Sequence, residues 1–165
     1  MRHLARLPTA AGQESVWDYP RPPRVVRDSR EVVVVLGGAE VCRTRGGLRV
    51  LETSHPPTWY LPEQDWAAGA LRPAAGSSFC EYKGVASYLT VVGGGRIADR
   101  AAWTYPDPLP AYEVLRGGVA VYPAAMDLCT VAGEPVRPQD GGFYGGWVTA
   151  DVVGPLKGGP GTSGW

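Results

Sequence analysis

The stretch that decides the fold runs Val85-Ala86-Ser87-Tyr88-Leu89-Thr90-Val91-Val92, followed by Gly93-Gly94-Gly95 and then by residues 96–105. Residues that favour strands flank a run of glycines, which accept the positive φ angles that tight hairpins require. The pattern predicts two antiparallel strands joined by a turn at residues 93–95. We interpret the three glycines as this turn and not as a phosphate-binding loop.

Shorter strands are expected on both sides of this hairpin. Residues typical of strands gather in runs at 31–36, 40–44, 48–52, 58–61, 119–122 and 128–131. The first run is almost unbroken Val, which favours a strand covered on both faces. Residues 62–66 and 111–116 predict short helical turns. Because the strands follow one another closely, we expect a mainly β fold: a single compact antiparallel domain, tent-like or barrel-like.

The composition divides the chain into three parts. Residues 1–27 are rich in Pro and Arg and predict an irregular N-terminal arm packed on the core, and residues 28–133 form the β core domain. Residues 134–165 form an extension rich in Gly and aromatic residues. Phe143, Tyr144, Trp147 and Trp165 each offer about 150 Å² or more of surface for burial. We therefore expect the extension to wrap on the core.

Charge and cysteine usage restrict the partners. Sixteen Lys and Arg residues balance sixteen Asp and Glu residues, whereas nucleic acids and anionic membranes select a basic surface. We therefore expect neither as a partner. No apolar run reaches the length of a membrane span or a signal core. Cys42, Cys80 and Cys129 are widely spaced, which favours reduced thiols in the cytoplasm over disulfides or a zinc site, so we expect no metal and no cofactor.

The candidate site centres on Thr53-Ser54-His55-Pro56-Pro57. A residue before proline is restricted to extended geometry, so His55 projects from a stiff bend after the strand at 48–52. Lys83 follows in Cys80-Glu81-Tyr82-Lys83-Gly84 and is one of two lysines among fourteen arginines. His55 suits general acid–base catalysis, Lys83 a cation or an amine nucleophile, and Glu52 a residue that orients the imidazole.

His55, Lys83 and at least one of Glu52, Tyr82, Tyr88 and Tyr105 are expected to line one shared cavity, although alternatives remain. Glu52 and His55 lie on opposite faces of an extended strand, so the bend must re-aim one of them before they can touch. A hydrogen-bonded bend histidine and a structural ion pair between Lys83 and Glu52 are the competing interpretations. Lys157 either arrives with the docked extension as a second cation or stays solvated.

Ligand-binding candidates surround these residues: Tyr60, Tyr82, Tyr88, Trp103, Tyr105, Trp17 and Arg21. Tyrosines donate hydrogen bonds and pack against ligands. A second interpretation is a non-catalytic module that recognises a planar or cationic ligand, or a modified side chain, in an aromatic pocket of Trp17, Trp59 and Trp103. Arg21 also opens a mixed-sign run of arginines that is typical of a solvated face.

Three segments together resemble one known family. They are residues 49–62, which include Glu52-Thr53-Ser54-His55-Pro56-Pro57, residues 79–88, which include Cys80-Glu81-Tyr82-Lys83-Gly84, and residues 101–108 around Trp103-Thr104-Tyr105. They resemble the domain of unknown function family numbered 427, and the likeness extends over nearly the whole chain. It implies a compact β domain related in shape to zinc-binding tent folds, without the cysteine pairs that hold zinc there.

The resemblance also brings a nucleotidyltransferase-like label. The sequence has neither an Asp-x-Asp pair nor a Gly-x-x-x-x-Gly-Lys loop, so nucleotidyl transfer is the least favoured function. We expect instead that the protein binds a small polar or anionic metabolite around His55 and Lys83. Whether acid–base catalysis follows binding, and whether the protein forms oligomers, stays open at this point.

Overall fold

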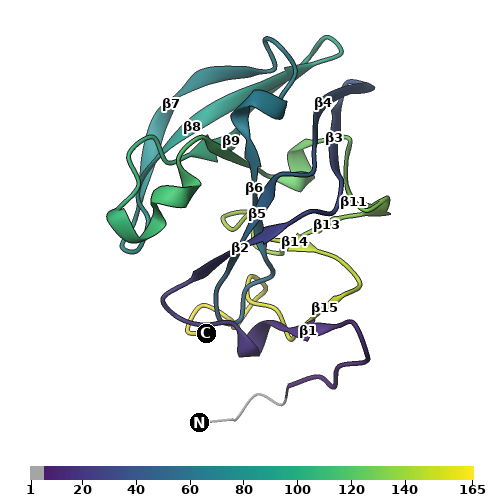
Figure 1. Ribbon diagram of the computed structural model, residues 1–165, viewed down its shortest axis with the longest axis vertical. Helices are drawn as coiled ribbons and strands as arrows, with labels where there is room; N and C mark the ends of the chain where they lie inside the picture. Colours follow the sequence, from purple (N-terminus) through teal and green to yellow (C-terminus); the bar gives the residue numbers. More distant parts are fainter. Residues whose placement is uncertain (1–5) are drawn as a thin grey trace.

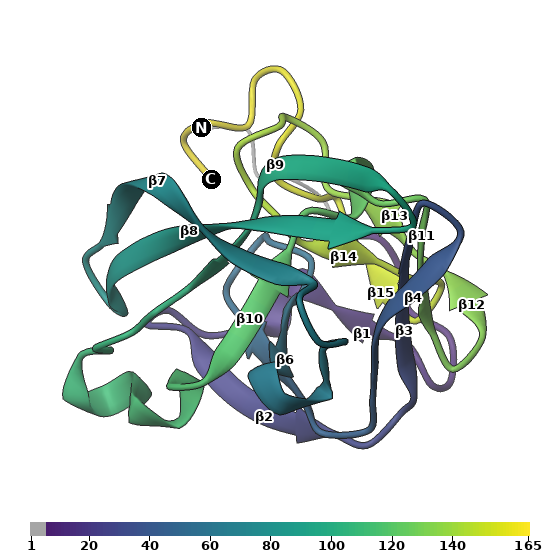
Figure 2. The same ribbon diagram turned by 90° about the horizontal axis from the view of Figure 1, so that it is seen from above.

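The computed structural model describes residues 6–165, and two of its long strands form the predicted hairpin. β8 (Gly84–Gly93) and β9 (Arg96–Thr104) pair antiparallel through the glycine turn. The turn packs backbone to backbone against the turn that follows β3 (Val32–Leu36). A Cβ on Gly94 would overlap the carbonyl of Gly37, so both turns require glycine at this contact. Figure 2 shows β8 and β9 crossing the molecule toward β3.

The main sheet has seven antiparallel strands in the order β2-β5-β6-β10-β9-β8-β7 (Figure 1). Besides β8 and β9 it contains β2 (Arg24–Asp28), β5 (Gly47–Leu51), β6 (Thr58–Pro62), β7 (Leu71–Cys80) and β10 (Gly118–Val121). The sheet is open, with β2 and β7 at its edges, so the described residues form no closed barrel. The expected mainly β, antiparallel and compact fold is confirmed.

A second antiparallel sheet covers one face of the first. Its order is β12 (Glu134–Pro135), β11 (Leu128–Val131), β3 and β4 (Ala39–Thr44). Val32, Val34 and Leu36 of β3 are buried, whereas the two residues between them are half-buried. The expectation that this strand is covered on both faces is therefore wrong, because an antiparallel sheet packs one face on the core and leaves the other toward solvent. The core between the sheets includes Val34, Leu61, Val91, Val121 and Trp147.

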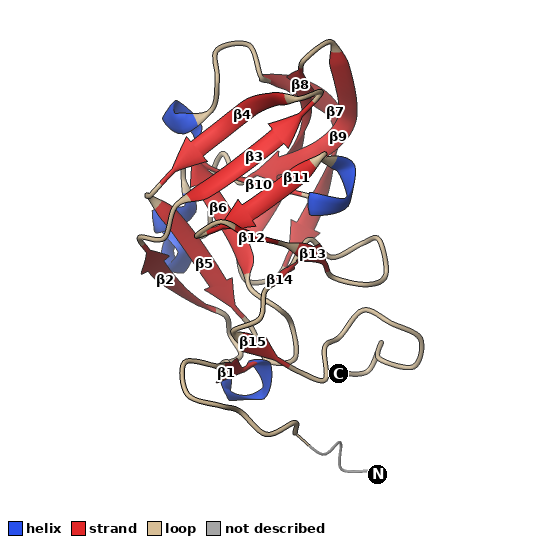
Figure 3. Ribbon diagram, turned by 90° about the vertical axis from the view of Figure 1, so that its right-hand side faces the viewer, coloured by secondary structure: helices blue, strands red, loops and turns tan. Residues whose placement is uncertain are grey.

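Within residues 6–165, four short 3₁₀ helices link the strands (Figure 3). They are η1 (Val16–Asp18), η2 (Glu63–Asp65), η3 (Pro110–Leu115) and η4 (Pro123–Ala125). η2 and η3 coincide with the two predicted helical turns. No helix in residues 6–165 is long and apolar enough to cross a membrane.

Two strands of the main sheet lie where none was expected. Arg24–Asp28, most of it assigned to the irregular arm, forms β2 and pairs with all of β5. Leu71–Cys80 forms β7 although Pro73 and Gly76 disfavour strands, and its register shifts between Pro73 and Ser77. Pairing with a neighbouring strand decides both cases. The first five residues of the predicted arm lie outside the described part of the chain.

The C-terminal extension is part of the folded body. β13 (Arg137–Pro138) pairs with β14 (Trp147–Val148), and β15 (Val152–Val153) pairs in parallel with β1 (Glu14–Ser15). Figure 1 shows the two terminal segments side by side below the main sheet. The expectation of a docked extension is therefore met for Trp147, which is 1% exposed. It is wrong for Phe143, which is 69% exposed.

Candidate functional site

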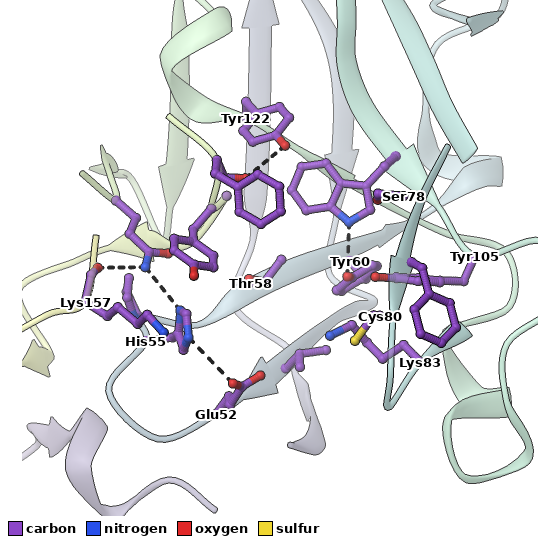
Figure 4. A pocket seen from close by; sticks show the side chains of 18 of the residues that line it. Glu52, His55, Thr58, Tyr60, Ser78, Cys80, Lys83, Tyr105, Tyr122 and Lys157 are labelled. Carbon is purple, nitrogen blue, oxygen red and sulfur yellow. Dashed lines mark hydrogen bonds and ion pairs between the residues drawn. The ribbon is translucent and has the colours of Figure 1, made fainter. Parts of the chain in front are cut away.

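A cavity of about 280 Å³ lies between the main sheet and the C-terminal extension (Figure 4). The core side of its lining is supplied by Val50, Glu52, His55, Pro56, Thr58, Tyr60, Ser78, Phe79, Cys80, Lys83, Tyr88, Trp103, Tyr105 and Tyr122. The extension supplies Gln139, Phe143, Tyr144, Gly145 and Lys157. The volume is near the lower end of the range for small-molecule sites, roughly 300–1,000 Å³.

The structure brings all three catalytic candidates to this cavity. Glu52, His55 and Lys83 line it, together with four of the ligand-binding candidates: Tyr60, Tyr88, Trp103 and Tyr105. Convergence of these residues is therefore a structural fact. Their catalytic and ligand-binding roles stay predictions.

The remaining candidates lie elsewhere. Neither Tyr82 nor Arg21 lines the cavity. Arg21 pairs with Glu52, which does line it, at 3.3 Å. Trp17 packs on Trp165 with ring centroids 5.4 Å apart, and Trp59 is 2% exposed within the core. The aromatic pocket proposed from Trp17, Trp59 and Trp103 therefore does not form. Trp side chains carry large apolar area, and two of these three are used for packing.

A tight turn places Glu52 and His55 on the same side of the chain. Ser54 has φ of 73°, in the left-handed region, and the His55 amide donates to the Glu52 carbonyl at 3.0 Å. This turn reverses the strand direction, so the two side chains approach to 3.6 Å between His55 Nε2 and Glu52 Oε2. The prolines stiffen the chain after His55, but the left-handed conformation of Ser54 is what turns the imidazole toward Glu52.

His55 is half-buried, and its imidazole is neutral at neutral pH. Burial lowers its pKa to about 4, and the charges of Lys157, Arg21 and Lys83 act in the same direction against the opposing effect of Glu52. Its ring meets that of Tyr144 edge to face at 4.8 Å, and Gln139 Nε2 lies 3.2 Å from its Nδ1. The contact with Glu52 is therefore not a charged pair at neutral pH.

Two lysine ammonium groups give the cavity a positive charge. Among residues 6–165, no carboxylate lies within ion-pair distance of Lys83, so the alternative of a Lys83–Glu52 ion pair is wrong. Lys83 Nζ lies instead 5.9 Å from the centroid of the Tyr105 ring. Lys157 Nζ donates to a backbone oxygen of Trp165 at 3.0 Å and lies over the Tyr144 ring. Among the side chains of the lining, two lysine charges against the single carboxylate of Glu52 leave one net positive charge.

Phenols and an indole form the other wall. Trp103 Nε1 donates to the Tyr60 hydroxyl at 3.2 Å, and the Tyr60 and Tyr105 rings are 6.2 Å apart. Burial raises the pKa of both tyrosines, so both remain protonated at neutral pH. Figure 4 shows Tyr105 and Lys83 on one side of the cavity and His55 and Lys157 on the other.

The cysteines divide into two kinds. Cys42 and Cys129 are buried, and burial raises the pKa of each thiol to about 12, which makes both inert. Cys80 is half-buried and lines the cavity. Within the described part of the chain, no three His, Cys, Asp or Glu side chains cluster in a way that could hold a metal ion.

Sequence reasoning missed much of the lining that the extension supplies. Gln139 and Gly145 were not singled out, Phe143 and Tyr144 were expected only to pack, and Lys157 was left between two alternatives. On the core side, Thr58, Ser78 and Tyr122 were also missed. The aromatic spacing of the glycine-rich segment was the one available signal, since it indicated docking without indicating where.

Comparison with known proteins gives a family and no relative of known activity. No curated protein matches the chain. A family model described as a domain of unknown function (DUF427) matches residues 24–132, which is more than half of the chain. The matched region contains the turn with His55, the strands β5 to β10 and Lys83. The protein therefore belongs to the DUF427 family.

Proposed function

We propose that this protein binds a small anionic metabolite in the cavity between the main sheet and the C-terminal extension. The observation that carries the proposal is the pair of ammonium groups, Lys83 and Lys157, in a lining with one carboxylate. Glu52 is itself paired with Arg21, which further reduces its repulsion of an anion. A partly enclosed wall strengthens such charge interactions relative to bulk water.

Aromatic side chains support a ligand with a planar or apolar part. Tyr60, Trp103 and Tyr105 offer flat surfaces and polar edges, which contact a ring and hydrogen-bond its substituents. The cavity volume of about 280 Å³ fits a metabolite and excludes a macromolecule. The free thiols at Cys42, Cys80 and Cys129 support a reducing, cytoplasmic location for this function.

The alternatives fit the charge less well. A cationic ligand of the kind that aromatic cages bind would meet two ammonium groups in this cavity. Nucleotidyl transfer relies on converging carboxylates that hold Mg²⁺, whereas Glu52 alone represents that group in the lining described. Anion binding is thus the function that the geometry supports best.

The test is a thermal-shift screen of small carboxylates, phosphates and sulfonates, each paired with a neutral amide or alcohol of the same shape. A ligand at 100 times its Kd adds about 2.7 kcal/mol to the free energy of unfolding. For a domain of this size that corresponds to a rise in Tm of about 5–10 °C. Any hit is then incubated with the protein and followed for turnover, which separates an enzyme from a binding protein.

Two variants locate the binding. Lys83→Ala is expected to abolish the shift, whereas Arg96→Ala removes one positive charge from an exposed position on β9 and is expected to preserve it. An anion that shifts Tm equally in wild type and Lys83→Ala would contradict the assignment to this cavity. A panel in which only the neutral compounds raise Tm would contradict anion binding itself.

A further inference from the structure

One buried amide determines what His55 can do in this cavity. Gln139 is 5% exposed and its side chain has three polar contacts. Its Oε1 accepts from the Gly146 amide at 3.1 Å, and its Nε2 donates to the Lys157 carbonyl at 2.7 Å. Nε2 also lies 3.2 Å from His55 Nδ1.

The two backbone contacts fix the direction of the amide. A backbone N–H only donates and a backbone carbonyl only accepts, so a flipped Gln139 would lose both bonds and face like groups. Nε2 must therefore stay on the side of Lys157 and His55. Since Nε2 is a donor, His55 Nδ1 must be the acceptor. The ring proton of neutral His55 then resides on Nε2, which faces Glu52.

The chain around this contact is built for close approach. A Cβ at Gly146 would lie 2.5 Å from Gln139 Oε1 and 2.6 Å from Pro56 Cγ, so only glycine fits there. The Trp147 amide donates to the Pro57 carbonyl at 2.8 Å, and the Lys157 amide donates to the Ser54 carbonyl at 2.8 Å. These bonds tie the extension to both sides of the His55 turn, so the amide and the imidazole are held in one frame.

We infer that Gln139 is a positioning residue that locks His55 in the Nε2–H tautomer, so that His55 offers the cavity a hydrogen-bond donor and no free basic nitrogen. This inference rests on the proposed function for its biological meaning. With Lys83 and Lys157 also donating, the site selects ligands whose deprotonated group only accepts hydrogen bonds, such as a carboxylate or a phosphate. The general-base role that the sequence suggested for His55 is blocked at Nδ1.

The charge state of His55 depends on groups from every segment around it. Glu52 lies on its own turn, Arg21 on the N-terminal arm, Lys83 before β8, and Lys157 on the extension, with the Tyr144 ring on the remaining side. Three of these four charges are positive and disfavour imidazolium. Protonation at Nδ1 would also place two donors, His55 Nδ1–H and Gln139 Nε2–H, against each other.

The experiment records two-bond ¹H–¹⁵N correlations of the histidine rings in uniformly labelled protein, with no ligand present. The chain has two histidines, and a His55→Gln sample identifies the second set of signals. We expect the His55 spectrum at pH 7 to show a protonated Nε2 and an unprotonated Nδ1. A protonated Nδ1, in either the other tautomer or the imidazolium form, overturns the inference.

A variant pair tests whether Gln139 is the cause. In Gln139→Glu an oxygen replaces Nε2 and faces both the Lys157 carbonyl and His55 Nδ1. An ionised carboxylate at this place accepts from a protonated Nδ1, so we expect the tautomer to change and the pKa of His55 to rise by about one unit or more. Gln64→Glu adds the same charge at an exposed site and is expected to leave the spectrum unchanged. A folded Gln139→Glu protein with the wild-type His55 spectrum overturns the role of Gln139.

The two proposals fail separately. The tautomer is measured on the free protein, so the absence of any anion that raises Tm leaves this result standing and counts only against the proposed function. If Gln139→Glu does not fold, the wild-type spectrum decides the tautomer, and Gln139→Met, which removes the donor at similar volume, decides the cause through a changed pKa of His55.

Discussion

Truncation of Trp147 tests whether the C-terminal extension is a structural part of the domain. Its side chain is 1% exposed, stacks on Trp59 with centroids 6.0 Å apart, and donates from Nε1 to the Val121 carbonyl at 3.2 Å. Trp147→Ala removes all three interactions at once. The extension would then lose one of the largest fully buried side chains of the protein.

The magnitude follows from the burial. A buried Trp removes about 150–250 Å² from water, which at roughly 25 cal/mol per Å² corresponds to about 4–6 kcal/mol as an upper bound. Large-to-small replacement of buried aromatic residues costs about 3–5 kcal/mol in practice. We therefore expect Trp147→Ala to lower the free energy of unfolding by about 3–5 kcal/mol, which is a fall in Tm of roughly 10 °C or more.

Urea unfolding followed by circular dichroism measures this loss, since the midpoint reports stability and the slope reports the surface exposed. Phe143→Ala is the matched control from the same segment, because that ring is 69% exposed and a surface truncation changes stability by about 0.5 kcal/mol or less. Trp147→Phe keeps an aromatic ring at this position but removes the hydrogen bond to Val121 and part of the packing, so an intermediate loss is expected. A loss below 1 kcal/mol for Trp147→Ala, with an unchanged slope, would refute the docking of the extension.

Two further variants probe the His55 turn. Because burial lowers the pKa of His55 to about 4 in the folded protein, against about 6.5 when unfolded, the unfolded chain binds more protons between these values and stability falls as the pH drops through this window. We expect urea unfolding to show that, between pH 7 and pH 4, the free energy of unfolding falls by roughly 3 kcal/mol more in wild type than in His55→Gln. The same pH dependence of stability in both proteins would contradict this. Ser54 combines a φ of 73° with a buried hydroxyl that has no partner in the described structure. Ser54→Gly removes both the strained φ and the unpaired hydroxyl, and it costs about 0.5–1 kcal/mol of chain entropy. We therefore expect calorimetry to show an equal or slightly higher Tm. A clear fall in Tm would count against strain at this position.

The strands that the sequence predicts are those whose own residues decide their conformation. β3 and β8 are rich in residues that favour strands, and the glycines after β8 mark the turn into its partner β9. β2 and β7 were not predicted, because pairing with the neighbouring strands β5 and β8 decides their conformation. Leu71–Cys80 contains Pro and Gly and becomes a strand only alongside β8. No local pattern encodes such pairing.

The residues of the cavity also divide into those that stand out in the sequence and those whose role depends on the fold. Glu52, His55 and Lys83 stood out because a rigid bend and a rare residue type are visible in one dimension. Gln139 carries no comparable mark, since its role depends on three partners that the fold brings together: Gly146, Lys157 and His55. A buried amide with a structural task resembles a solvated one in sequence. The direction of the His55 turn could not be predicted either. It depends on the left-handed conformation of Ser54, which is rare for serine and has no signal in the local sequence.

The residues proposed to bind an anion come from two parts of the chain. The family match ends at residue 132, whereas Gln139, Tyr144 and Lys157 all follow it. The matched core therefore supplies the His55 turn and Lys83, and the segment beyond it supplies the second cation and the amide that sets the imidazole tautomer. If the segment after β11 differs between two proteins with this core, the charge and the donor pattern of the cavity differ as well. Transplanting residues 133–165 between such proteins is expected to transfer anion preference together with the His55 tautomer, because Gln139 and Lys157 move as one unit with the strand pair β13–β14.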